Sequence, residues 1–82
     1  MAIPRDEHRI LGVVIARVRD DRRMSQHELA AKVRRRQPAI AKTELGTQTT
    51  DVAQFLDIAH ALGVTGVELF ALFEEAMSEQ QL

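Results

Sequence analysis

The sequence predicts one all-α domain built from five short helices. Its 82 residues allow a single hydrophobic core and leave no room for a second domain of ordinary size, so we expect one domain over residues 1–82. Apolar residues recur every three to four positions along most of the chain, between residues that typically cap or end helices. Trp and Tyr are absent, and no alternating β-branched run ends in a hairpin turn, so strands are not expected.

The first helix is expected over about residues 6–22. Leu11, Ile15 and Val18 fall at positions i, i+4 and i+7, which places them on one helix face. Gly12 lowers the helix propensity in the middle of this segment. We therefore expect Gly12 to allow close packing against another part of the chain.

The second helix is expected over residues 25–33. It opens with a capping box, in which the side chains of Ser25 and Glu28 each accept a hydrogen bond from the other residue's backbone amide. A third helix is expected over residues 37–44, because Pro38 lacks an amide hydrogen and fits only the first helical turn. A glycine two residues later is expected to end this helix.

The fourth helix is expected to begin near Asp51 and to end at Gly63. Thr65 and Glu68 form a second capping box, which opens a fifth helix over about residues 66–77, with the last five residues frayed. The apolar stripe of the fourth helix comprises Val52, Phe55, Ile58, Ala59 and Leu62.

Charge is strongly polarised along the chain. All eleven Lys and Arg residues lie in residues 1–45, which carry +5, whereas residues 46–82 hold six acidic residues and no Lys or Arg. The net charge of −1 hides this separation. The pattern suggests a basic face for a polyanion, with the acidic half turned away from it. Chance clustering on solvated helices is the alternative.

The second and third helices, joined by a turn near residues 33–36, have the proportions of a helix-turn-helix over about residues 25–45. Such geometry alone is weakly specific, because many helical bundles contain a similar pair.

The order and spacing of several motifs resemble the lambda-repressor-like, or XRE, family of DNA-binding domains. The resemblance covers roughly residues 11–70. It rests on Leu11-Gly12-x-x-Ile15-x-x-Val18-Arg19, Met24-Ser25-Gln26-x-Glu28-Leu29-Ala30-x-x-Val33, Gln37-x-x-Ile40-x-x-x-Glu44-x-Gly46, Phe55-Leu56-x-Ile58-Ala59-x-Ala61-Leu62-Gly63-Val64 and Glu68-Leu69-Phe70. It implies a five-helix, lambda-repressor-like domain whose helix-turn-helix binds double-stranded DNA.

The resemblance also implies roles for particular residues. Gln26 matches a position that contacts a phosphate and braces the reading helix. Arg19 and Glu44 match a pair that forms an internal salt bridge between the first and third helices. The residues that match the major-groove face are Arg36, Gln37, Pro38, Ala41 and Lys42.

The chemistry of these side chains agrees with such roles. Glutamine can read adenine through a paired donor and acceptor, and lysine or arginine can read guanine. Pro38 and Ala41 offer only apolar contact, for example to a thymine methyl group. Arg34, Arg35 and Arg36 enter from the turn, and we expect at least one of them to bind phosphate.

The turn departs from the family pattern. The family usually has a Gly where this chain has Arg34, and a small or polar N-cap where it has Arg36. Either the turn is distorted or Arg34 adopts a left-handed conformation at some cost in energy. Residues 47–50 contain no basic side chain, so phosphate contacts there would rely on hydroxyls and amides.

The fifth helix is apolar over about 160° of its circumference. A surface helix needs a stripe of only about 100°. The excess predicts a homodimer through Phe70, Phe73 and Met77, which would place two reading helices about 34 Å apart on one DNA face. A wide core stripe in a small domain is the alternative.

The leading hypothesis is a sequence-specific transcriptional regulator, a repressor or autoregulator, that binds a palindromic operator as a homodimer. One alternative is an antitoxin or adaptor whose C-terminal half binds a protein partner, such as a toxin or another regulator, with DNA binding for autoregulation. Another is a restriction–modification controller protein.

Enzymatic and metal-dependent functions are not expected. The chain has no Cys, no Gly-rich phosphate loop and no recognisable Ser–His–carboxylate set, so neither catalysis nor a cofactor is indicated. His8, His27 and His60 lack metal-ligand spacing. The start of the chain is charged, and the longest apolar run is too short to cross a bilayer, so a cytoplasmic protein without membrane contact is expected.

Overall fold

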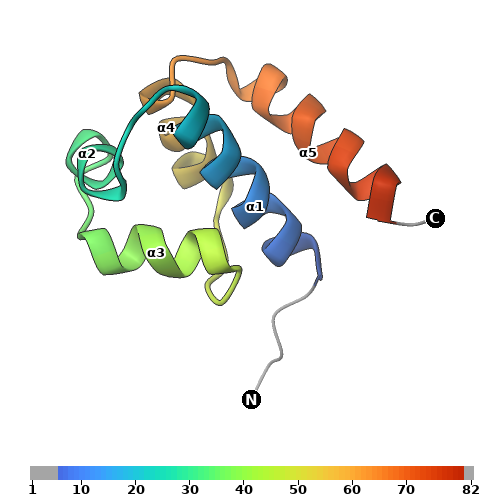
Figure 1. The fold of residues 1–82 in the computed structure, drawn as a ribbon, viewed down its shortest axis with the longest axis horizontal. Coiled ribbons are helices and arrows are strands. Elements are labelled where there is room, and N and C mark those ends of the chain that lie inside the picture. Colours follow the sequence, from blue (N-terminus) through green and yellow to red (C-terminus); the bar gives the residue numbers. More distant parts are fainter. Residues whose placement is uncertain (1–5, 81–82) are drawn as a thin grey trace.

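The computed structural model describes residues 6–80, and these residues form five α-helices and no strand (Figure 1). The expected all-α class is confirmed. The helices are α1 (Asp6–Asp21), α2 (Gln26–Lys32), α3 (Gln37–Leu45), α4 (Val52–Ala61) and α5 (Gly66–Gln80). Residues 1–5 and 81–82 lie outside the described residues, so the domain limits of 1–82 stay a prediction.

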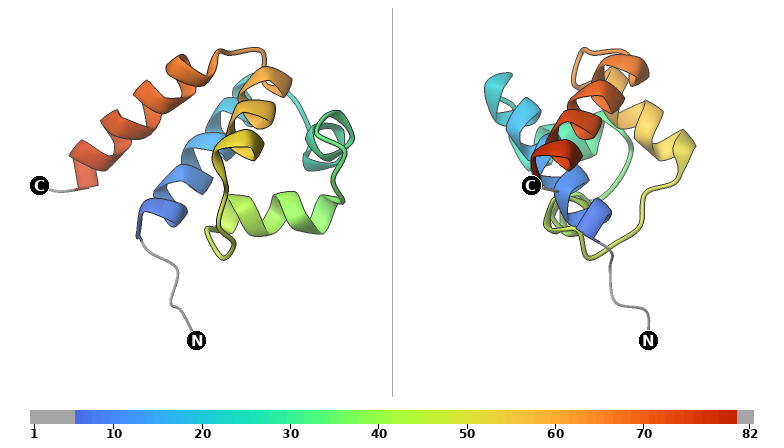
Figure 2. Two further views of the ribbon diagram at one scale, coloured as in Figure 1. Left: turned by 180° about the vertical axis from the view of Figure 1, so that it is seen from behind. Right: turned by 90° about the vertical axis from the view of Figure 1, so that its right-hand side faces the viewer.

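α1 lies between α3 and α5. α3 packs on one side of α1 and α5 on the other, while α2 and α4 complete the bundle (Figures 1 and 2). The core comprises Val14, Ile15, Val18, Leu29, Ala30, Ile40, Ile58, Ala59, Leu62 and Leu69. Burial of each large aliphatic side chain contributes about 1.5–3 kcal/mol, so this core fixes the positions of the helices relative to one another.

α1 and α3 come into backbone contact at Gly12. A Cβ atom at this position would collide with the main-chain carbonyl oxygens of Thr43 and Glu44. Thr43 is itself buried, and its hydroxyl donates a hydrogen bond to the Ala39 carbonyl at 3.0 Å. The close packing expected from the glycine is confirmed, and it holds the end of α3 directly against α1.

The expected helix starts are confirmed by their capping bonds. The Ser25 hydroxyl accepts from the Glu28 amide at 3.0 Å, and a Glu28 carboxylate oxygen accepts from the Ser25 amide at 3.1 Å. Thr65 and Glu68 repeat this pair of bonds at 3.0 and 3.4 Å. Asp51 caps α4 by accepting a backbone amide at 2.8 Å. These bonds satisfy amides that have no partner inside a helix.

Four helices end in the same arrangement, a Schellman motif. A left-handed residue donates its amide to the carbonyl three residues earlier, and the next amide donates to the carbonyl five residues earlier. The left-handed residues are Arg23 (φ 54°), Arg34 (φ 57°), Gly46 (φ 76°) and Gly63 (φ 81°). A side chain makes this conformation unfavourable by about 1–2 kcal/mol, so α1 and α2 end at a cost that α3 and α4 avoid.

The C-terminal half differs from the sequence-based expectations at two points. Val52 belongs to the apolar stripe expected for α4, but it does not pack into the core with Ile58, Ala59 and Leu62: its side chain is 85% exposed, because the first turn of α4 borders an open groove. The fifth helix was expected to end near Met77 and then fray, but α5 continues to Gln80. Residues 78–80 contain neither Gly nor Pro, so nothing in the sequence stops the helix there.

Residues 6–80 contain neither a metal-binding cluster nor a membrane-spanning helix. No three His, Cys, Asp or Glu side chains in this range are grouped so that they could hold a metal ion. No single helix of the same range is long and apolar enough to cross a bilayer. α4 and α5 reach that length and composition only as a pair, across a bend of 103°.

Candidate nucleic-acid interface

α2, α3 and the turn between them form a helix-turn-helix. Val33 follows α2 and packs against the core. Arg34 then reverses the chain in a left-handed conformation, and its amide and that of Arg35 donate to carbonyls of α2 at 3.3 and 2.8 Å. Arg36 is extended and precedes α3 without a side-chain capping bond. The turn therefore lies at residues 33–36, as the sequence predicts. Of the two expected forms, it adopts the one in which Arg34 is left-handed.

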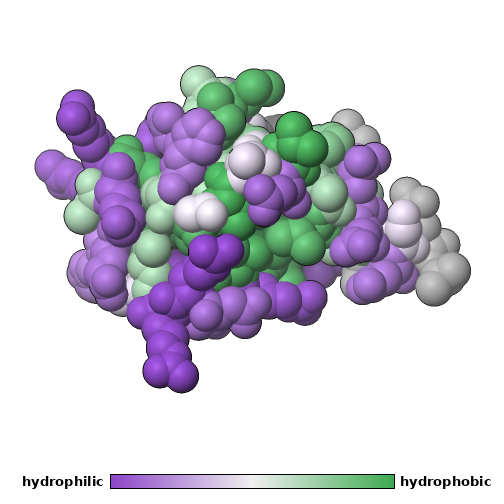
Figure 3. All heavy atoms as spheres, turned by 90° about the horizontal axis from the view of Figure 1, so that it is seen from above, coloured by the Kyte–Doolittle hydropathy of each residue, from purple (hydrophilic) through white to green (hydrophobic). Residues whose placement is uncertain are grey.

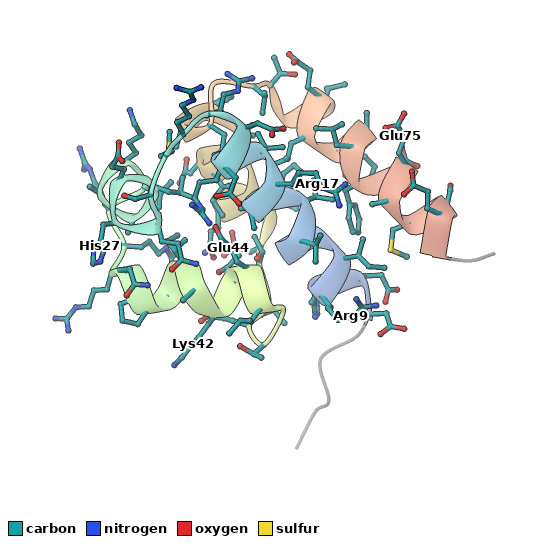
Figure 4. The ribbon with its side chains drawn as sticks, viewed as in Figure 1. Arg9, Arg17, His27, Lys42, Glu44 and Glu75 are labelled. Carbon is teal, nitrogen blue, oxygen red and sulfur yellow. The ribbon has the colours of Figure 1, made fainter. Side chains whose placement is uncertain are left out.

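α3 presents one face to the core and the opposite face to solvent. Ile40 and Thr43 are buried. Pro38 and Lys42 are exposed and Ala41 is half-buried. Figure 4 shows Lys42 projecting from the edge of α3, away from the other helices. An exposed helix face of this kind is what insertion into a major groove requires.

Leu45 belongs to the same solvent face and was missed by the sequence reasoning. Its side chain is 69% exposed. It follows Pro38 and Ala41 at spacings of seven and four residues, which aligns all three along one side of a helix. The same helical periodicity that located the core would have identified it.

The three arginines of the turn stand free in solvent at the start of α3. Arg34, Arg35 and Arg36 are all exposed. Within residues 6–80 their guanidinium groups have no hydrogen bond or ion pair, and neither has the ammonium of Lys42. These cations are therefore available to an external anion, without any internal pair to break first.

Arg19 of α1 and Glu44 of α3 are brought together in a bidentate ion pair. The Arg19 Nε and Nη2 atoms donate to the two Glu44 carboxylate oxygens at 2.7 and 3.1 Å, and Nη1 donates to the Met24 carbonyl at 2.7 Å. The side chains are only 12% and 6% exposed. The hydrogen bond from Glu44 raises the pKa of Arg19 above its usual value, against the opposing effect of burial. The pair therefore links α1 to α3 as a fixed charge pair.

Gln26 and Gln37 extend this pair into a chain of hydrogen bonds that reaches the start of α3. Gln26 Nε2 donates to Glu44 Oε1 at 2.8 Å, and Gln37 Nε2 donates to Gln26 Oε1 at 2.7 Å. Both amide side chains are half-buried. Gln26 thus lies between the internal ion pair and the outermost glutamine of the face, a position that allows it to brace α3.

Arg9 is a further basic residue on this side of the molecule that the sequence reasoning missed. A Cβ atom at Gly46 would collide with the Arg9 backbone, so Arg9 packs directly on the end of α3. Figure 4 shows Arg9 and Lys42 at the same edge of the molecule. No local motif marks Arg9 among the other basic residues of α1, because the contact joins segments far apart in the sequence.

The residues expected at a dimer interface fall partly within one apolar groove between α4 and α5. Phe70 is 49% exposed, and its ring lies 5.8 Å from that of Phe73 and 6.4 Å from that of Phe55. The groove has a volume of about 720 Å³ and includes Phe70 and Phe73 in its lining. Met77 is half-buried and is not part of that lining. The other apolar residues that line it are Leu11, Val52, Phe55, Leu56, Val67 and Ala71.

The acidic helix α5 lies apart from the basic turn, whereas α4 borders that turn, where Asp57 lines a pocket together with Lys32 and Arg34. α4 and α5 carry no Lys or Arg, and α5 lies on the side of α1 opposite to α3 (Figure 1). Figure 4 places Glu75 on the outer side of α5, far from Lys42. Seen from the end that carries the α4–α5 connection, the surface shows an apolar area framed by hydrophilic side chains (Figure 3).

Comparisons with known proteins agree with this architecture. Among solved structures, the clp gene regulator ClgR from Corynebacterium glutamicum superposes with a TM-score of 0.88 at 20% identity, over 96% of this chain and 84% of that one. The wild-type restriction-modification controller protein C.Esp1396I superposes with a TM-score of 0.83 at 20% identity, over 89% of this chain and 95% of that one. No protein of curated function matches the sequence. The family model of the helix-turn-helix domain matches residues 10–72, and the chain therefore belongs to the helix-turn-helix domain family.

Proposed function

We propose that this chain is a sequence-specific transcriptional regulator that binds a palindromic operator as a homodimer and acts as a repressor or autoregulator. One observation carries the proposal: α3 offers a solvent-facing side with Lys42, and at its start stand three exposed arginines that form no ion pair with any residue of the range 6–80. A DNA ligand also agrees with the cytoplasmic location expected from the sequence.

The turn supplies the affinity for the phosphate backbone. Phosphate contacts make up most of the non-specific binding energy of such proteins and position the protein on the duplex. Arg34, Arg35 and Arg36 carry three positive charges that have no ion pair within residues 6–80, so they lose none there when they bind phosphate. Arg9 packs on the other end of α3 and forms an ion pair with Asp6 at 3.8 Å, and it would add a further phosphate contact there.

α3 supplies the sequence preference. Gln37 and Lys42 are the polar side chains placed to reach base edges, Gln37 towards adenine and Lys42 towards guanine. Pro38 and Ala41 provide apolar contact, and Leu45 extends that apolar strip along the same side of the helix. This division predicts that variants of the turn lose affinity for all duplexes, whereas variants of α3 lose sequence preference.

The groove between α4 and α5 supports self-association. Val52 and Val67 are 85% and 81% exposed in its lining, and Phe70, which is 49% exposed, lines it as well. Apolar clusters of this kind on a small protein usually mark a contact with another molecule. A twofold contact through α5 and the groove would repeat α3 on both halves of a palindrome.

A restriction–modification controller protein is the second candidate. The controller structure is similar over 95% of its own length, so the present chain has the same helices and no additional sensing element within residues 6–80. The antitoxin or adaptor alternative requires a protein ligand in the α4–α5 groove instead of a second copy. Co-purification of a single defined partner in place of a homodimer would favour it.

Selection of bound fragments from a random duplex pool tests the proposal. We expect enrichment of one palindrome with half-site centres about 34 Å apart. Fluorescence anisotropy on that palindrome should show an affinity that falls steeply as salt rises, because phosphate contacts release counterions. For variants that remove one arginine of the turn, Arg17→Ala is the charge-matched control, since Figure 4 places Arg17 on the side of α1 that faces α5. No enrichment, or an affinity that salt does not change, would contradict the proposal.

A further inference from the structure

The hydrogen-bond chain from Arg19 to Gln37 constrains which end of each glutamine amide faces outward. A glutamine amide presents a carbonyl oxygen, which only accepts, and an NH2 group, which only donates. Rotation about its last bond exchanges the two ends with little change in shape. The end that Gln37 offers to DNA therefore depends on what its neighbours accept or donate.

Glu44 imposes a direction on Gln26. Its carboxylate is an acceptor only, and both oxygens already receive hydrogen bonds from Arg19, at 2.7 and 3.1 Å. The end of the Gln26 side chain that lies 2.8 Å from Glu44 Oε1 must be its NH2 group. The reversed amide would bring two acceptor oxygens together. The Gln26 carbonyl oxygen is then turned towards α3.

The same argument applies one step further along the chain. The Gln26 Oε1 atom accepts from Gln37 Nε2 at 2.7 Å, and reversal of the Gln37 amide would again face two oxygens. Gln37 therefore uses one N–H internally and keeps its Oε1 atom and its second N–H for an external ligand. One acceptor beside one donor complements adenine, which offers N6–H as a donor and N7 as an acceptor in the major groove.

From this geometry we infer that Glu44, although it lies inside the protein, is a positioning residue for base preference. Through Gln26 it fixes the direction of the Gln37 amide and so favours adenine at the base pair that Gln37 contacts. The inference rests on the proposed function. The inference gives the internal ion pair a second role: besides joining α1 to α3, the pair controls which base is preferred.

The test compares Glu44→Gln with Glu28→Gln. Glu28→Gln makes the same change of charge but retains the capping box, in which Gln can replace Glu. For each protein, the measurement is the ratio of affinities for the selected duplex and for duplexes with another base at the position that Gln37 contacts. A partial loss of folded protein cancels in this ratio, so a purely structural role would leave it unchanged. We expect Glu44→Gln to lower the adenine preference about tenfold, because a Gln at this position no longer forces one direction on Gln26.

Gln26→Ala provides a second route if Glu44→Gln does not fold. It cuts the chain without altering the Arg19–Glu44 pair, so we expect the same loss of preference. The double variant should lose no more than either single variant. If Glu44→Gln and Gln26→Ala both kept the adenine preference measured for Glu28→Gln, the inference would be overturned.

A measurement without DNA separates this inference from the proposed function. In NMR spectra of the free protein, the side-chain NH2 resonances of Gln37 should shift in Glu44→Gln. That shift should vanish when Gln26→Ala is already present, because the two residues then have no connecting amide. Unshifted Gln37 resonances in Glu44→Gln would overturn the inference whether or not the wild-type chain binds DNA. Failure of the wild-type chain to bind any duplex would instead overturn the proposed function.

Discussion

Gly12 of α1 lies against the backbone carbonyl oxygen of Glu44 in α3, with no space for a side chain between the two helices. The contact occurs at the residue whose carboxylate also holds Arg19. Close backbone packing and the ion pair therefore act on the same end of α3. Both contacts therefore fix the position of α3 relative to α1.

Gly12→Ala should destabilise the fold by about 1–2 kcal/mol. The added methyl group would meet backbone carbonyl atoms of α3 that cannot rotate away, so the overpacking should lie in the upper part of the usual range, at about 2–3 kcal/mol. Improved helix propensity offsets about 1 kcal/mol of this cost. Chemical denaturation followed by circular dichroism measures the change. Gly66→Ala is the matched control, because its Cβ atom would meet only the flexible end of Leu56, at 3.0 Å. Equal stability of Gly12→Ala and the wild type would show that α3 can move away freely.

Arg34→Gly should stabilise the protein while weakening its binding to DNA. Glycine relieves a left-handed strain of about 1–2 kcal/mol but gives the unfolded chain more freedom, so the net gain is about 0.5–1 kcal/mol. The loss of one phosphate contact should reduce the salt dependence of the affinity by about one unit of slope. Thermal unfolding and anisotropy titrations at several salt concentrations measure the two effects.

Arg23→Gly is the control for that trade-off. Arg23 has nearly the same backbone conformation, with φ of 54° against 57° for Arg34, but it follows the C-terminal end of α1 and does not belong to the turn between α2 and α3. Its replacement should raise stability by a similar amount and leave the salt dependence unchanged. If both variants lost DNA affinity equally, net charge would explain the effect and the turn would have no special role.

Lys42→Ala and Arg35→Ala should impair DNA binding in different ways. Lys42 lies on the solvent face of α3, so its removal should relax sequence preference by about 1–3 kcal/mol at one position. Arg35 lies in the turn, so its removal should weaken binding to all duplexes alike and reduce the salt slope by about one. Anisotropy titrations against the selected operator and a scrambled duplex separate the two patterns. Identical behaviour of the two variants would mean that the reading face is assigned wrongly.

Phe70→Asp should convert a homodimer into a monomer. The ring is half exposed in the α4–α5 groove, where a buried charge without a partner would oppose association. Sedimentation equilibrium at micromolar to high micromolar concentration measures the change. Ala31→Asp is the control, since Ala31 is an exposed residue of α2 away from this groove. A wild-type chain that remains monomeric at high micromolar concentration would exclude the dimer.

The local features of the fold could be predicted from the sequence because their causes are local. The bonds between Ser25 and Glu28 join residues three positions apart, and the pattern of residue types is sufficient to predict them. Pro38 places the start of α3 for the same reason. The exposure of Val52 could not be predicted in this way, because it depends on whether a neighbouring helix covers the first turn of α4.

The candidate site shows the same division. Helical spacing and the resemblance place Pro38, Ala41 and Lys42 on one face, and the structure shows that face open to solvent. The bonds that connect Gln26 to Glu44 and to Gln37 join residues 18 and 11 positions apart on separate helices. Side-chain rotamers and helix packing decide whether such bonds form, and neither can be read from spacing along the chain.

The position of α1 between α3 and α5 sets a distance as well as a contact. A helix with its side chains is about 10–12 Å wide, so α1 acts as a rigid spacer between the groove that would join two copies and the surface that would meet DNA. The separation of two reading helices is then a property of this spacer and not of the residues that touch bases. An operator lengthened by one base pair between its half-sites should therefore be rejected even when both half-sites are intact.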